Sequence, residues 1–238
     1  MGGTERSRLE TGPTSTPFPQ VAAGLIGAQG VMSYLGPAQT MESYGMKSDA
    51  FTDAIVRGSG AWQMCAAATM VLDEETILDK AFIPVIAAML LYIPAITEVK
   101  GGVPKEPLIA WLGVHSVLAT LAESGKVNKW VCPGLFLFNG LQVYFAPEHT
   151  FKLYGGPALS AEAVHVTRVL GTAMLCTGAY LSALANGDGA RKGIGYAYLV
   201  AAGTVIRSFV FDTDLGVSRP MLAAWIVACL GIAYLGLN

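Results

Sequence analysis

Charged residues are scarce in this chain of 238 residues, where they make up 13% of the total and hydrophobic residues make up 53%. The mean hydropathy of +0.50 is higher than that of ordinary soluble domains. The 15 Lys and Arg are spread between apolar segments and the net charge is −2, so no basic surface is available for nucleic acid. The composition therefore predicts an integral membrane protein whose partner is the lipid bilayer and not a nucleic acid.

The chain also lacks the residue patterns of most membrane enzymes and pumps. No Asp or Glu lies in the middle of an apolar stretch, which disfavours ion-driven transport. The four cysteines stand singly, without a Cys-x-x-Cys pair, and are expected to be small buried hydrophobic residues. No zinc-ligand spacing, nucleophile motif or phosphate-binding loop is present. These absences favour a non-catalytic protein without a metal site.

Eight apolar stretches can be marked along the chain. They cover residues 18–36, 51–72, 81–97, 107–122, 130–146, 163–185, 193–211 and 219–237. Each approaches the ~20 residues that a helix needs to cross a bilayer, and the alternation typical of a transmembrane barrel is missing. We therefore expect an all-α fold with about eight transmembrane helices. Residues 1–17 are polar and are expected to form an N-terminal tail rather than a secretory signal.

The two halves of the chain repeat each other. Residues 24–45 align with residues 134–155 at a constant offset of 110, and eight of these 22 positions are identical. After one inserted residue the match continues at Arg57/Arg168, Gly60/Gly171 and Cys65/Cys176. Two four-helix repeats, 18–124 and 130–238, are therefore expected. Because four spans return the chain to its starting side, the repeats should be parallel and related by an approximate two-fold axis along the membrane normal.

The most similar part of the repeat is a turn motif after its first helix. Its residues are Pro37, Thr40, Tyr44 and Gly45 in the first repeat and Pro147, Thr150, Tyr154 and Gly155 in the second. Proline is expected to begin a short helix, threonine to bond backbone groups, tyrosine to point its hydroxyl out of the membrane, and glycine to end the helix. Arg57 and Arg168 follow and are expected to bond the carbonyls of that turn. This pattern favours a structural motif over a ligand site.

An apolar span that ends in Phe-Ala-Pro-Glu-x-Thr, followed by a Tyr-Gly turn and an Arg-x-x-Gly helix, resembles the DoxX-like group of small four-helix membrane proteins. The resemblance covers residues 24–68 and 134–179, and it is clearest at Glu148, His149 and Thr150. Ala38 replaces the glutamate in the first repeat, which argues against a required carboxylate. The resemblance implies a tandem duplication of that fold. A few members are associated with quinone-linked or thiol-linked redox complexes, but no catalytic set transfers to this chain.

His115 is the one candidate cofactor ligand. It lies in the stretch LIAWLGVHSVLATL, four residues after Trp111 and therefore on the same helical face. A neutral imidazole there can bond a protein group or ligate the metal of haem or chlorophyll. We expect a hydrogen bond within the protein. The second repeat has no histidine at the equivalent place, which disfavours a symmetric pair of haems, and His149 and His165 are expected at the membrane boundary.

The 28 glycines supply small residues three or four apart, a spacing that lets membrane helices pack closely. The leading interpretation is a non-catalytic accessory or assembly subunit of a larger photosynthetic or respiratory complex, in an organelle inner or thylakoid membrane. A second interpretation is a membrane-embedded enzyme or carrier for a small lipophilic molecule such as a sterol, quinone or pigment. A third is a chlorophyll- or haem-binding subunit that uses His115.

Overall fold

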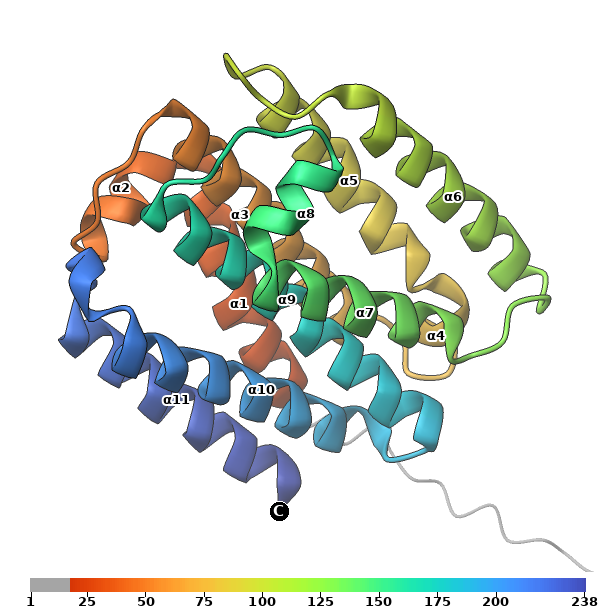
Figure 1. Cartoon of the computed structure of the whole chain (residues 1–238). Helices are drawn as coiled ribbons and strands as arrows, with labels where there is room; N and C mark the ends of the chain where they lie inside the picture. Colours follow the sequence, from red (N-terminus) through yellow and green to blue (C-terminus); the bar gives the residue numbers. More distant parts are fainter. Residues whose placement is uncertain (1–17) are drawn as a thin grey trace, which may run out of the picture.

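The computed structural model describes residues 18–238, so the expected tail at residues 1–17 lies outside the described residues. The described part is helical and contains no strand (Figure 1). Its helices are α1 Phe18–Leu35, α2 Pro37–Ser43, α3 Ala50–Val71, α4 Ile77–Lys80, α5 Phe82–Thr97, α6 Lys105–Glu123, α7 Val131–Phe145, α8 Pro147–Leu153, α9 Ala161–Asn186, α10 Gly189–Phe211 and α11 Arg219–Leu237. A short 3-10 helix, η1, covers Thr213–Leu215. The expectation of an all-α fold is confirmed.

The same order of helices occurs twice along the chain. A long helix, a short helix and three further long helices run from α1 to α6, with α4 as an added turn, and again from α7 to α11. Each of the eight apolar stretches in the sequence coincides with one long helix. The helical parts of the sequence interpretation therefore agree with the structure to within a few residues.

The two second long helices, α3 and α9, pack against each other at the centre of the bundle (Figure 1). Each begins at a side chain that accepts a hydrogen bond from the first turn: Asp49 Oδ1 accepts from Thr52 N at 2.7 Å, and Ser160 Oγ accepts from Ala163 N at 3.1 Å. These caps satisfy backbone N–H groups that have no partner within a helix. Both central helices therefore begin at a defined N-terminal cap.

The first helix of each repeat lies unusually close to its central helix. A Cβ added at Gly60 would lie 2.5 Å from the Gly30 carbonyl oxygen, and one added at Gly171 would lie 2.7 Å from the Tyr144 nitrogen. Any side chain at either position would therefore push the two helices apart. The expected role of small residues in helix packing is confirmed at these two crossings.

The outer surface of the helical bundle carries many large apolar side chains. The outer helices expose large apolar residues such as Phe145 (73%), Val227 (71%) and Phe138 (67%). The central helices bury threonines, whose hydroxyls bond their own helix, as Thr69 does to Cys65 O at 2.8 Å. An apolar exterior around buried polar residues is typical of a bundle that faces lipid or other apolar helices.

Four helical segments are long and apolar enough to cross a membrane. They are Ile77–Thr97, Ala161–Asn186, Gly189–Phe211 and Arg219–Leu237. Val131–Phe145 is apolar but shorter. The structure therefore supports a membrane protein with several candidate spans.

Candidate functional site

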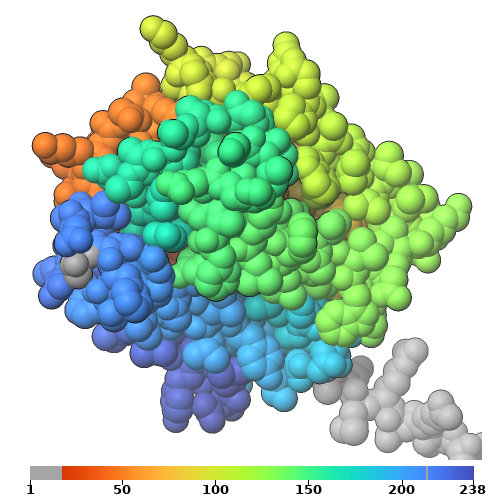
Figure 2. Space-filling view, in the orientation of Figure 1, coloured from red at the N-terminus to blue at the C-terminus, as the bar shows by residue number. Residues whose placement is uncertain are grey.

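Two partly open cavities flank the central helix pair, and residues of both α3 and α9 line each of them. The first, here called the α6 cavity, has a volume of about 100 Å³ and is bounded by α5 and α6 of the first repeat and by α7 and α8 of the second. The second, here called the α11 cavity, has a volume of about 180 Å³ and is bounded by α1 and α2 of the first repeat and by α10 and α11 of the second. Figure 2 shows the surface hollowed between the yellow-green α6 and the green segment of α7 and α8.

Equivalent residues of the two repeats line the two cavities. The pairs, with the α6-cavity residue first, are Asn139/Gln29, Thr150/Thr40, Tyr154/Tyr44, Leu108/Leu222, Trp111/Trp225 and His115/Cys229. Each cavity thus combines the first two helices of one repeat with the last two helices of the other. Neither repeat by itself therefore contains a complete cavity wall.

The turn motif holds the repeats in this crossed arrangement. Ser218 N, just before α11, donates to Tyr44 O at 2.8 Å. In the other half, Gly155 lies against Pro104, just before α6, with Pro104 Cγ 3.2 Å from the place of a Gly155 Cβ. The turn of each repeat therefore contacts the start of the last helix of the other repeat.

Most mechanical roles expected of the turn motif are confirmed. Pro37 and Pro147 occupy the first turn of α2 and α8. Gly45 and Gly155 follow these helices with φ of 76° and 73°, a left-handed conformation that glycine adopts without a steric penalty. Thr150 Oγ1 donates to Ala146 O at 2.8 Å, which satisfies a carbonyl at the start of α8.

The expected outward direction of the tyrosine hydroxyls is wrong for the first repeat. Trp225 Nε1 donates a hydrogen bond of 2.8 Å to the Tyr44 hydroxyl at the α11 cavity. Burial raises the pKa of Tyr44 above its usual value, and the bond from Trp225 opposes this rise. Burial likewise raises the pKa of Tyr154, against a smaller opposite effect of Trp111. Both tyrosines therefore interact with the tryptophan of the other repeat.

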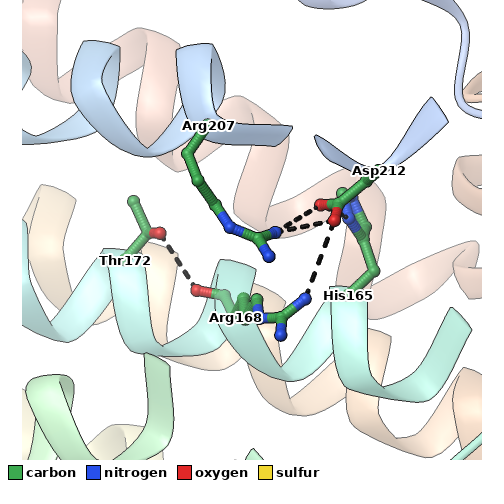
Figure 3. Close-up of polar contacts among 5 residues, drawn as sticks. All are labelled: His165, Arg168, Thr172, Arg207 and Asp212. Carbon is green, nitrogen blue, oxygen red and sulfur yellow. Dashed lines mark hydrogen bonds and ion pairs between the residues drawn. The ribbon is translucent and has the colours of Figure 1, made fainter. Parts of the chain in front are cut away.

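A cluster of charged side chains lies at one end of the α11 cavity, near the start of α9 and the end of α10 (Figure 3). Asp212, directly after α10, is buried and accepts from Arg207 Nη1 at 2.6 and 2.8 Å. Its Oδ2 also lies 2.8 Å from His165 Nδ1, and its Oδ1 lies 3.7 Å from Arg168 Nη1. Burial alone would raise the pKa of Asp212, but the bond and charge of His165, together with Arg207, lower it to about 2. Asp212 is therefore an ionised carboxylate at neutral pH.

This cluster corrects one expectation for the second repeat and adds a partner for His165. His165, in the second turn of α9, is buried, 4% exposed, and paired with Asp212. Arg168 pairs with Asp212 rather than with the preceding turn. The first repeat has no such cluster, since Ala54 stands where the second repeat has His165 and Arg57 is exposed. No sequence pattern joins Arg168 to Asp212, because the rest of α9 and the whole of α10 lie between them along the chain.

His115 faces the α6 cavity and is buried. Its Nδ1 lies 2.8 Å from Trp111 O, so the expected hydrogen bond within the protein is confirmed. Because a carbonyl oxygen can only accept, Nδ1 carries a proton.

Two buried polar atoms at the cavities lack a hydrogen-bond partner within the described part of the chain. They are Trp62 Nε1 at the α6 cavity and Gln63 Oε1 at the α11 cavity. Such atoms are unfavourable unless a bound molecule or water satisfies them. All four cysteines are free and buried, as the sequence predicted, and three of them line a cavity: Cys132, Cys176 and Cys229.

Comparisons with known proteins add no family to this description. The chain matches no family model, no curated protein and no solved structure.

Proposed function

We propose that this chain is an integral membrane protein of about eight spans that binds small lipophilic molecules in the two cavities between its repeats. The observation that carries the proposal is the duplication of the cavity wall. The same Thr, Tyr, Leu and Trp positions line both cavities, although the surrounding helices differ in sequence. A mostly apolar cavity with a few polar groups is the usual form of a site for a small molecule.

The membrane part of the proposal rests on the outer surface and on the length of the helices. Four segments are long and apolar enough to span, and α10 and α11 expose large apolar residues such as Val210 and Val227. The remaining long helices, α1, α3, α6 and α7, would complete eight spans in two parallel repeats. The resemblance of the turn motifs to DoxX-like proteins is part of this proposal and agrees with a helical repeat that binds a lipophilic redox compound.

A pair of equivalent substitutions tests the binding function. Leu222→Trp and Leu108→Trp would fill the α11 and α6 cavities, since both leucines are buried in the walls. The full chain would be purified in mild detergent, and its bound lipophilic molecules would be extracted and identified by mass spectrometry. We expect a defined molecule on the wild-type protein and its loss in at least one variant. Val227→Trp, on the 71% exposed outer face of α11, is the matched control.

The accessory-subunit interpretation remains the second candidate. The exposed apolar faces of α7 and α11 suit neighbouring membrane helices as well as lipid. The same purification distinguishes the two functions. Stoichiometric protein partners without a bound small molecule would favour a subunit of a larger complex, whereas a bound molecule without partners supports the proposed binding function.

A further inference from the structure

The two cavities have equivalent walls but different electrostatics. No Lys, Arg, Asp or Glu lines the α6 cavity, whereas Arg168 and His165 line the α11 cavity. Arg168 and Arg207 contribute two positive charges to the cluster, and Asp212 contributes one negative charge. The cluster therefore has an excess of one positive charge even when His165 is neutral. We infer that the α11 cavity binds a single-chain amphiphile whose anionic head group pairs with Arg168, an inference that rests on the proposed binding function.

Arg168 is the member of the cluster best placed to bind an anion. Arg207 already makes two short bonds to Asp212, whereas the closest distance from Arg168 to that carboxylate is 3.7 Å, beyond hydrogen-bonding range. The Arg168 side chain is 24% exposed and lines the cavity. A guanidinium presents five N–H donors in a planar fork that suits a carboxylate or a phosphate. An anionic head group would accept the hydrogen bonds that the Arg168 guanidinium does not make to Asp212.

The depth of the cavity suits a chain attached to that head group. The charged wall residues, His165 and Arg168, lie in the first turns of α9, and Ser208 lies in the last turn of α10. The rest of the wall is uncharged, with Ala173, Cys176 and Ala201 beside neutral polar residues such as Gln63 and Tyr198. From Arg168 to Cys176 the rise of α9 is roughly 12 Å. One charged end and an uncharged, mostly apolar remainder match a molecule with one anionic end and one alkyl chain.

Binding of a 12-carbon series to the full chain tests this inference. Dodecanoate, dodecyl phosphate and 1-dodecanol would be measured in nanodiscs of phosphatidylcholine, with empty nanodiscs as the correction for partitioning. We expect the wild-type protein to bind at least one of the two anions at least tenfold more tightly than the alcohol. Arg168→Gln should remove this preference, and Arg168→Lys should keep most of it because the charge remains.

Arg57→Gln is the matched control, since Arg57 occupies the equivalent position in the first repeat but is exposed and lines neither the α6 nor the α11 cavity. It should leave the preference unchanged. Leu222→Trp, which leaves the cluster intact and fills the cavity, should weaken binding of all three probes, and it provides a test if Arg168→Gln does not fold.

Three results would overturn the inference. One is equal affinity of the wild-type protein for dodecanol and both anions, which would leave the proposed function intact. Another is an equal effect of Arg57→Gln and Arg168→Gln. The third is competition by inorganic phosphate as strong as that by dodecyl phosphate, which would identify a site for a free anion. Failure of all three probes to bind would instead count against the proposed function as well.

Discussion

The indole of Trp225 and the hydroxyl of Tyr44 form a hydrogen bond of 2.8 Å that joins the last helix of the second repeat to the turn motif of the first. Trp111 and Tyr154 occupy the equivalent positions at the other cavity. Since the two residues of each pair come from different repeats, these pairs connect the halves of the chain at the cavity walls.

Loss of the Tyr44 hydroxyl should destabilise the fold. Tyr44→Phe removes the acceptor and leaves Trp225 Nε1 without its partner. A net hydrogen bond of this kind contributes about 1 kcal/mol, and we expect a decrease of this size in the free energy of unfolding measured in mixed micelles. Tyr234→Phe is the control, because Tyr234 is 67% exposed on α11. Equal effects of the two substitutions would mean that the Trp225 bond does not stabilise the protein.

Glycine-to-alanine substitution should have opposite effects at the two glycine crossings and at an uncrowded position of α10. Gly60→Ala and Gly171→Ala place a Cβ 2.5 Å and 2.7 Å from backbone atoms, so each should cost about 1–3 kcal/mol in unfolding free energy. Gly203→Ala meets nothing within 4 Å and should stabilise α10 by roughly 0.5–1 kcal/mol. Chemical unfolding of the three variants in mixed micelles measures whether each substitution lowers or raises the free energy of unfolding. A stable Gly171→Ala protein would contradict the close packing of α7 on α9.

Helix positions and the backbone of the turn motif could be predicted from the sequence, because both depend on local chemistry. Apolar stretches of sufficient length marked every long helix, and Pro37 and Gly45 marked the beginning and end of α2. A hydrogen bond of His115 within the protein was also predictable, since a buried imidazole needs a partner; its acceptor proved to be Trp111 O in the same helix.

The crossed cavities could not be predicted, because they depend on how the two repeats pack. The sequence comparison paired Tyr44 with Tyr154 as equivalent residues but gave no sign that each lies at the tryptophan of the other repeat. The charged cluster was missed for the same reason. Asp212 and Arg168 each lie near the end of an apolar stretch, which suggested separate boundary residues rather than a buried ion pair.

Acid should destabilise the protein through Asp212. Its pKa in the folded protein is about 2, below the ordinary value of 3.8, so ionised Asp212 stabilises the folded state. This contribution is fully present above about pH 4 and is lost as the pH falls from about 4 to about 2. Asp212→Asn should be less stable than the wild type at neutral pH, with a shallower loss of stability over that range. Thermal unfolding across the pH series, with Asp79→Asn at an exposed site as control, measures the difference.

His115 decides between a packing role and a cofactor role in the first repeat. Its ring bonds Trp111 O and lies beside Phe82, with ring centroids 6.1 Å apart, in a cavity of about 100 Å³. We therefore expect the purified wild-type protein to show no visible absorption band. His115→Leu should cost only about 1 kcal/mol of unfolding free energy, because the carbonyl of Trp111 remains bonded within α6. A visible band that disappears in His115→Leu, while the fold persists, would instead show that the cavity opens to admit a haem or chlorophyll and that Nε2 is its ligand.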